Sequence, residues 1–250
     1  MNAITRQEVE EVFMAEEAHA SSTMQERAQL YHFLEVALAH PGEEGYEYFR
    51  RETTSLLFLV QFADLMQADD ETSRKGLIAA NRFFELIGKM SYEDVESAHI
   101  SLFSSNYPHL PCPPYGSIFT AIDSEKRLDE MLAIKEFYQR NGIDIAETFD
   151  DLPDHLCVEL EFMQVLCFRE HEANQKNDIE LISGLRATQS EFLDRFLLPF
   201  VNRLAELATQ SVPDNPYSHL LEVTRCFITQ HYQELDTRTE SSSSDQEGQS

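Results

Sequence analysis

The most constraining feature of this chain is a cluster of four prolines in seven residues: Pro108, Pro111, Pro113 and Pro114. Proline fixes φ and lacks a backbone donor, so neither a helix nor a central strand can run through the cluster. The stretch Leu110–Phe119 reads LPCPPYGSIF. A stiff, apolar segment of this kind is a candidate binding surface when helices surround it, and a plain connector between two helical halves is the alternative.

Helix-start patterns lie on both sides of the proline cluster. Thr5 with Glu8, Thr23 with Glu26, and Ser91 with Asp94 have the spacing of capping boxes. Asp123 and Asp178 are further candidate caps, and Asn141-Gly142 is a candidate helix end. We expect a helix over Gly45 to Gln67, whose stretch Leu56–Phe62 is apolar on nearly all sides and should be central to the core. Other helices are expected over Thr72 to Gly88, over Asp178 to Gln210 with a kink or break at Pro199, and over Tyr217 to Leu235.

No stretch alternates in hydrophobicity as a strand would, and no internal repeat is visible. We therefore predict an all-α fold, a single helical domain of about nine or ten helices over residues 1–236, with a binding loop or hinge at residues 106–120. Residues 237–250 read TRTESSSSDQEGQS. This acidic, serine-rich segment has nothing to bury and is expected to be a disordered tail.

The net charge of −26 comes from 45 acidic and 19 basic residues. Such a surface repels nucleic acid and anionic lipid and attracts a basic partner, although solubility alone also explains it. The four cysteines contain no CxxC pair, so no metal site is expected. No cofactor motif is visible, and no cofactor is expected. The cysteines are expected to be reduced thiols of a reducing compartment. We find no signal peptide, and the longest apolar run, Leu56 to Val60, is too short to span a bilayer. A cytoplasmic location follows as an expectation.

Asp154 and His155 form the most suggestive polar pair. Adjacent helical residues point about 100° apart, so the two cannot form a simple catalytic dyad unless the chain bends. Asp154 is expected to favour the start of a helix, while His155 could be a surface histidine or a donor in a binding groove. No GxSxG, HExxH, GxGxxG or phosphate loop occurs. We predict that the chain is not an enzyme; a small helical hydrolase or nucleotide-binding enzyme using Asp154 and His155 is the alternative, and a general acidic adaptor is a third possibility.

Two motifs resemble a known family. CPPYGS follows a helix that ends in Leu102-Phe103, and PDHLCVELEFM comes about forty residues later. This pairing resembles the TorD/DmsD/NarJ family of all-helical cytoplasmic chaperones for molybdenum-containing redox enzymes. The later stretches RFLLPFVNRLAEL and NPYSHLLEVTRCF are also similar to the last two helices of that family.

The resemblance implies a function and a site. Members of the family bind the N-terminal segment, often a twin-arginine signal, of a molybdoenzyme catalytic subunit until its cofactor is inserted, and so prevent premature export. Members occur as monomers or swapped dimers. By motif, the client-binding residues here would be Leu102, Phe103, Pro114, Tyr115, Gly116, Ser117, Asp154 and His155. An apolar trough would take the apolar part of the signal, and Asp154 would meet its arginines.

Overall fold

The computed structural model describes the backbone of residues 23–66, 70–105, 110–146 and 151–247, and the side chains of these residues up to Asp236. Within these residues the regular elements are helices, and the only β pairing is a single isolated bridge, which agrees with the predicted all-α class. A helix at residues 23–38 comes first. It is followed by α2 (Glu43–Phe49), α3 (Glu52–Met66), α4 (Glu71–Lys89), α5 (Tyr92–Phe103), α6 (Ser117–Thr120), α7 (Arg127–Arg140), α8 (Leu156–Gln175), α9 (Ile179–Phe192), α10 (Leu198–Ser211) and α11 (Pro216–Glu247).

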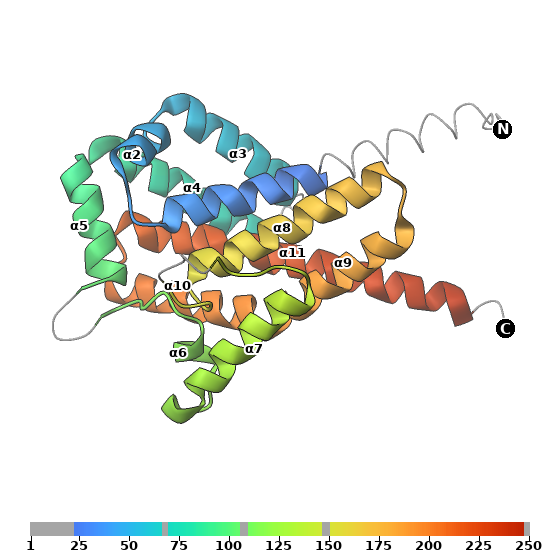
Figure 1. Cartoon of the computed structure of the whole chain (residues 1–250). Helices are drawn as coiled ribbons and strands as arrows, with labels where there is room; N and C mark the ends of the chain where they lie inside the picture. The colour runs from blue at the N-terminus through green and yellow to red at the C-terminus, as the bar shows by residue number, and fades with distance from the viewer. Residues whose placement is uncertain (1–22, 67–69, 106–109, 147–150, 248–250) are drawn as a thin grey trace, which may run out of the picture.

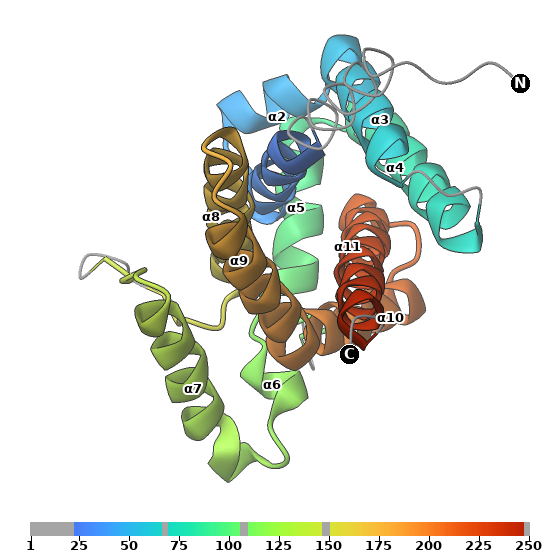
Figure 2. The same ribbon diagram turned by 90° about the vertical axis from the view of Figure 1, so that its right-hand side faces the viewer.

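The core is built around α11. This helix packs most extensively against α4 and then against α10, and it also contacts α5 and α9 (Figure 2). Leu221, Val223 and Ile228 on α11 are fully buried. The helix at residues 23–38 lies between α3 and α8 (Figure 1). Other helices therefore surround α11, and α8 packs on the outside of this group with Leu160 and Met163 fully buried.

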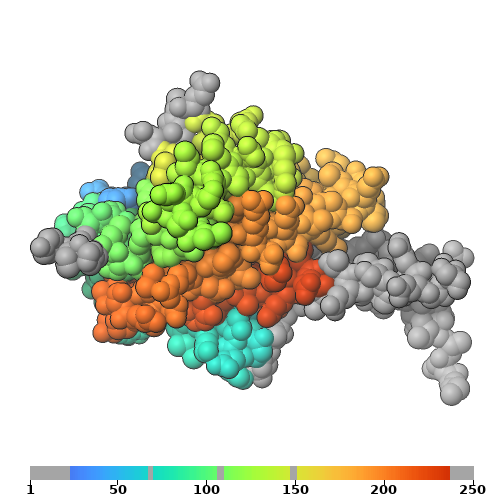
Figure 3. Space-filling view, turned by 90° about the horizontal axis from the view of Figure 1, so that it is seen from below, coloured from blue at the N-terminus to red at the C-terminus, as the bar shows by residue number. Residues whose placement is uncertain are grey.

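The outer layer contains α7, which contacts α6 and packs directly on α8 and α9, since the Phe137 ring lies 5.8 Å from that of Phe162 and 5.4 Å from that of Phe192, centroid to centroid (Figure 2). Figure 3 shows α7 lying over one edge of the face that α9 and α10 form, with α4 reaching the surface on the other side of α11. Ile134, Phe137 and Tyr138 are the buried residues of α7. The loop before α8 packs against this helix, because the Tyr138 hydroxyl donates to the Pro153 carbonyl at 3.1 Å.

Several predicted helix boundaries are confirmed. Ser91 and Asp94 form a reciprocal capping box at the start of α5, and the Asp178 side chain accepts from Leu181 N at the start of α9. The helix predicted from Asp178 is divided as expected: a π-helical turn at Leu193–Leu197 separates α9 from α10, and Pro199 stands in the first turn of α10. These signals act within one turn of chain, so sequence alone exposes them.

The single helix predicted over Gly45 to Gln67 is wrong, because the chain breaks at Arg50–Arg51 into α2 and α3. Tyr46 and Phe49 are the buried residues of α2, while Phe58 and Phe62 are buried on α3. At about 100° per residue, one straight helix would point these two pairs to nearly opposite sides. The break lets both pairs reach the same core.

The prediction that Leu56–Phe62 is central to the core is only half right. Phe58 and Phe62 are buried, whereas Leu56, Leu57 and Val60 are 55%, 67% and 60% exposed. An all-round apolar pattern normally indicates a buried helix. Here α3 lies on the outside of the bundle (Figure 1), so only one of its faces finds a partner.

The two ends of the chain bear on earlier predictions. The helix expected from Thr5 lies outside the described residues. Within the chain, Pro108 of the proline cluster lies outside them too. At the other end α11 continues as far as Glu247, into the segment that the sequence suggests is a tail. A helix can extend beyond its packed part, since each added residue contributes one backbone hydrogen bond. The disordered tail at residues 237–250 stays a prediction. Among the described residues, no helix has both the length and the apolar character needed to cross a membrane.

Candidate functional site

The proline segment is joined to the start of α8 by backbone hydrogen bonds. Tyr115 and His155 form an isolated antiparallel bridge. On one side of it Leu156 N donates to the Pro114 carbonyl at 2.9 Å, and on the other Gly116 N donates to the Asp154 carbonyl at 2.8 Å. The two motifs found in the sequence are therefore in direct contact, although about forty residues separate them.

Cys112 anchors the other end of this segment. Its backbone N–H donates to the Leu102 carbonyl at 3.1 Å, and its buried thiol donates to the Leu204 carbonyl at 3.8 Å. Burial raises the pKa of this thiol to about 12, so it remains protonated and acts as a small apolar residue with a weak donor. The segment is thus fixed to α5 and α10 before it reaches Tyr115.

A surface groove of about 530 Å³ lies between the proline segment, α8 and the helix at residues 23–38. Its walls come from five parts of the chain. The lining residues are Glu35, Leu38, Ala39, His40, His99, Phe103, Ser104, Leu110, Pro114, Tyr115, Asp151, His155, Leu156, Cys157, Val158 and Glu161. A groove of this size with mainly apolar walls and a few polar groups has the form of a ligand or peptide site.

The groove is lined by three carboxylates and three histidines, His40, His99 and His155. Glu35, Asp151 and Glu161 line it, and no lysine or arginine of the described chain does. Burial raises the pKa of Glu35, His32 opposes the rise, and the Glu161 carboxylate adds to it. Burial, followed by the same three carboxylates, raises the pKa of the Cys157 thiol to about 12. The groove is therefore suited to a cation, because an approaching positive charge would relieve this repulsion.

His155 has a structural task that the sequence analysis did not assign to it. It is the N-cap of α8, and its Nδ1 accepts a hydrogen bond from Cys157 N at 3.2 Å. The proton of the neutral ring is therefore on Nε2, which lies 3.9 Å from Asp151 Oδ2. Burial lowers the pKa of His155, which favours this neutral form. The Tyr115 ring packs edge-on against His155 with 5.4 Å between ring centroids.

Asp154 is buried beneath the groove and does not line it. Only 2% of the residue is exposed, and its Oδ2 accepts from Ser117 N at 2.9 Å. The expectation that Asp154 favours the start of its own helix is wrong, because His155 caps α8 while Asp154 caps the first turn of α6. This crossing contact fixes the position of the turn that follows Tyr115.

A second buried carboxyl, Glu159, lies next to Asp154. Asp154 Oδ1 and Glu159 Oε2 have no hydrogen-bond partner within the described chain. Burial raises the pKa of Glu159 well above its ordinary value, and the Asp154 carboxylate raises it further. Gly116 completes this arrangement, since a Cβ there would lie 2.7 Å from Glu159 Oε1. The adjoining cavity of about 10 Å³ is too small for any side chain.

The structure divides the eight predicted site residues into two layers. Phe103, Pro114, Tyr115 and His155 line the groove, although Phe103 and Pro114 are themselves largely buried and present little surface to it. Leu102, Gly116, Ser117 and Asp154 are buried, and Leu102 is fully enclosed. The motif therefore combines residues that can touch a ligand with residues that hold those in place.

The sequence analysis missed the acidic residues of the groove. Glu35 and Asp151 come from distant parts of the chain, and no local pattern connects them with Tyr115. A signal did exist for Glu161, because helical spacing places Val158 and Glu161 on one side of α8, near His155. Glu161 already stands in the motif PDHLCVELEFM, nearly two helical turns after His155, so tracing the His155 face along the motif would have identified it.

The geometry argues against the alternative enzyme reading. The carboxylate of Asp154 bonds to Ser117 N and the ring of His155 bonds to Cys157 N, so the two side chains are engaged with different backbone groups. Neither arrangement orients a base toward a nucleophile, as acid–base chemistry would require. The described residues also contain no cluster of three or more histidine, cysteine or acidic side chains that could hold a metal.

Comparison with known proteins decides the family. The model of the nitrate reductase delta subunit family matches residues 67–206, which is more than half of the chain. The chain belongs to this family. The predicted kinship with the TorD/DmsD/NarJ chaperones is confirmed.

Two relatives illustrate the match. The perchlorate reductase assembly chaperone protein of Dechloromonas aromatica (strain RCB) is 24% identical over 216 residues, which cover 84% of this chain and 89% of the relative. The chaperone protein TorD of Vibrio cholerae serotype O1 (strain ATCC 39315 / El Tor Inaba N16961) is 29% identical over 126 residues, covering 49% of this chain and 54% of TorD. Both are named as chaperones, which are not enzymes. These names support a chaperone role here and confirm the non-enzymatic prediction.

Proposed function

We propose that this protein is a cytoplasmic chaperone that binds the N-terminal segment of a molybdenum-containing oxidoreductase catalytic subunit. It holds a twin-arginine-type segment while the molybdenum cofactor is inserted, and so delays export. The observation that carries this proposal is the groove beside Tyr115, which has apolar walls, three carboxylates and no lysine or arginine among its described lining. A segment that is basic and then apolar complements both properties.

The two layers of the site have different roles in this function. Tyr115 and Phe103 supply apolar contact, and His155 Nε2 supplies a donor for a client carbonyl. The carboxylates of Glu35, Asp151 and Glu161 receive the client's arginines, because a charge-assisted bond to arginine is among the stronger polar contacts. Asp154 is a positioning residue that acts through Ser117.

The test is binding of a synthetic N-terminal segment from a candidate molybdoenzyme, measured by calorimetry. We expect Tyr115→Ala to weaken binding about tenfold or more, since large apolar contacts of this kind are worth on the order of 2 kcal/mol. Tyr48→Ala is the matched control, because Tyr48 is an exposed tyrosine that does not line the groove. His155→Ala should also weaken binding.

Charge gives an independent check of the same proposal. If the acidic groove steers a basic segment, the association rate should fall as salt is raised, because screening acts beyond about 8 Å at physiological ionic strength. Equal binding to signal peptides of unrelated enzymes would favour the general adaptor instead. Binding unaffected by Tyr115→Ala and His155→Ala would reject the groove as the site.

A further inference from the structure

A second hollow continues the groove along α8. It has a volume of about 320 Å³ and is lined by Tyr138, Ile143, Asp144, Ile145, Ala146, Val158, Glu161, Phe162 and Val165. Val158 and Glu161 line both hollows. The two are therefore neighbouring compartments with a common wall on one helix.

The residues of α8 that line the two hollows form one continuous wall. Val158, Glu161 and Val165 are three and then four residues apart, so they lie along one face of α8. At about 1.5 Å per residue, the distance from His155 to Val165 is about 15 Å. A client segment of about ten helical residues, or about five extended ones, could lie along it.

The two compartments differ in chemistry. The first has Glu35 and Asp151 in addition to the shared Glu161, while the second adds one carboxylate, Asp144, and five of its nine lining residues are aliphatic side chains from residues 143–146 and from α8. Glu161 is exposed and makes no ion pair within the described chain. A cation seated on Glu161 would therefore stand between a compartment with two further carboxylates and a mainly aliphatic one whose single further carboxylate is Asp144.

We propose that the second hollow receives the apolar stretch of the client segment, with the basic residues held at Glu35, Asp151 and Glu161. The client then lies along α8 in one direction, its basic part toward the helix at residues 23–38 and its apolar part toward α7. This inference rests on the proposed function and adds the orientation of the client and the residues that read its apolar part.

The experiment uses two synthetic peptides and the full-length chain. The long peptide carries an arginine pair followed by a leucine-rich stretch, and the short one ends soon after the arginine pair. We expect the wild-type protein to bind the long peptide more tightly. Val165→Glu should weaken the long peptide about tenfold, because a charge would replace an apolar wall, and should leave the short peptide unchanged. Glu161→Gln should weaken both.

Phe168→Glu is the matched control, since Phe168 is an exposed apolar residue of the same helix that lines neither hollow. It should leave both affinities unchanged, and circular dichroism should show all three variants to be folded. If the wild type binds both peptides equally, or if Val165→Glu binds the long one normally or weakens both alike, the second hollow is not a client site while the proposed function stands. Binding of neither peptide by the wild type would reject the proposed function and this inference together.

Discussion

Two buried carboxyls on α8 have opposite surroundings. Glu170, near the end of the helix, and Glu159, near its start, are 2% and 1% exposed. Eleven residues separate them, which is close to three helical turns, so they face the same side. Glu170 Oε1 accepts from Arg186 Nε at 2.6 Å and Oε2 accepts from Gln189 Nε2 at 2.7 Å. Among the described residues, Glu159 has no cation beside it.

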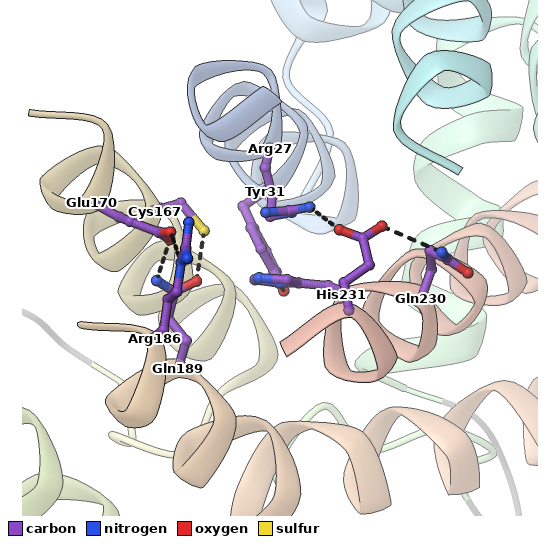
Figure 4. A network of polar contacts seen from close by, with 9 residues as sticks. Arg27, Tyr31, Cys167, Glu170, Arg186, Gln189, Gln230 and His231 are labelled. Atoms are coloured by element: carbon purple, nitrogen blue, oxygen red, sulfur yellow. Dashed lines mark hydrogen bonds and ion pairs between the residues drawn. The ribbon is translucent and has the colours of Figure 1, made fainter. Parts of the chain in front are cut away.

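The Glu170 cluster has partners for each of its side chains. Figure 4 shows Arg186 and Gln189 converging on Glu170 from α9, while the Cys167 thiol donates to the Gln189 amide oxygen at 3.4 Å. On the neighbouring helices, Tyr31 pairs with His231 at 2.9 Å in the same view. A fully partnered buried network fixes how helices pack and offers nothing to a ligand.

The Glu159 cluster contains carboxyl oxygens that lack hydrogen-bond donors among the described residues. Asp154 is committed to Ser117, and neither Asp154 Oδ1 nor Glu159 Oε2 has a partner among the described residues. Unsatisfied buried groups cost stability and are retained mainly where function requires the arrangement. This cluster lies beneath Tyr115 and His155. Glu170 therefore holds helices of the bundle together, whereas Asp154 and Glu159 support the shape of the groove.

The largest expected effect is the loss of stability when Glu170 is substituted. Glu170→Ala should lower the free energy of unfolding by about 3 kcal/mol, because it leaves Arg186 and Gln189 without their acceptor. The estimate is at the lower end for buried pairs, since the Arg186 side chain is 30% exposed and can be hydrated. Denaturant unfolding measures it, with the exposed Glu172→Ala as control. Equal stability of the two variants would show that the network contributes little.

Asp154 should give a smaller effect that depends on the replacement. Asp154→Ala removes the acceptor for Ser117 N and should cost about 1–2 kcal/mol of stability, as loss of a helix cap does, and client binding should fall as the turn moves. Asp154→Asn keeps an acceptor oxygen, so both properties should stay near wild type. Calorimetry with the client segment distinguishes the roles: a folded Asp154→Asn protein that no longer binds would mean that the carboxylate itself meets a client arginine.

The third effect has the opposite sign. The pKa of Glu159 is raised by burial and then by Asp154, so the folded state keeps a proton that the unfolded state loses above its ordinary value of 4.5. The stability that this group contributes is present below about pH 4.5 and is lost as the pH rises from there to the pKa of the folded state. The total loss is about 1.4 kcal/mol for each unit by which the folded-state pKa exceeds the unfolded one.

Glu159→Gln cannot lose a proton, so it should be more stable than wild type near neutral pH and equal to it near pH 4. Thermal unfolding across this range measures the difference. The same substitution at Glu170 should destabilise the protein at neutral pH. If both variants behave alike, the contrast between the two ends of α8 is wrong.

Sequence alone determined the features that depend on neighbouring residues. The caps at Ser91 and Asp178 and the division near Pro199 could all be predicted, because each arises within one or two turns of chain. The pairing of the proline segment with the PDH motif also came from the sequence, through the family resemblance. In the structure this pairing is the bridge between Tyr115 and His155.

Only the tertiary structure decided which side chains are buried and which distant groups they contact. The sequence could not show that Leu57 on α3 is exposed, that Asp154 caps α6 while His155 caps α8, or that Glu35 joins Glu161 in one groove. Each depends on where a distant segment packs. A local pattern gives the direction of a side chain relative to its own helix, and burial and charge pairing are set by what lies opposite.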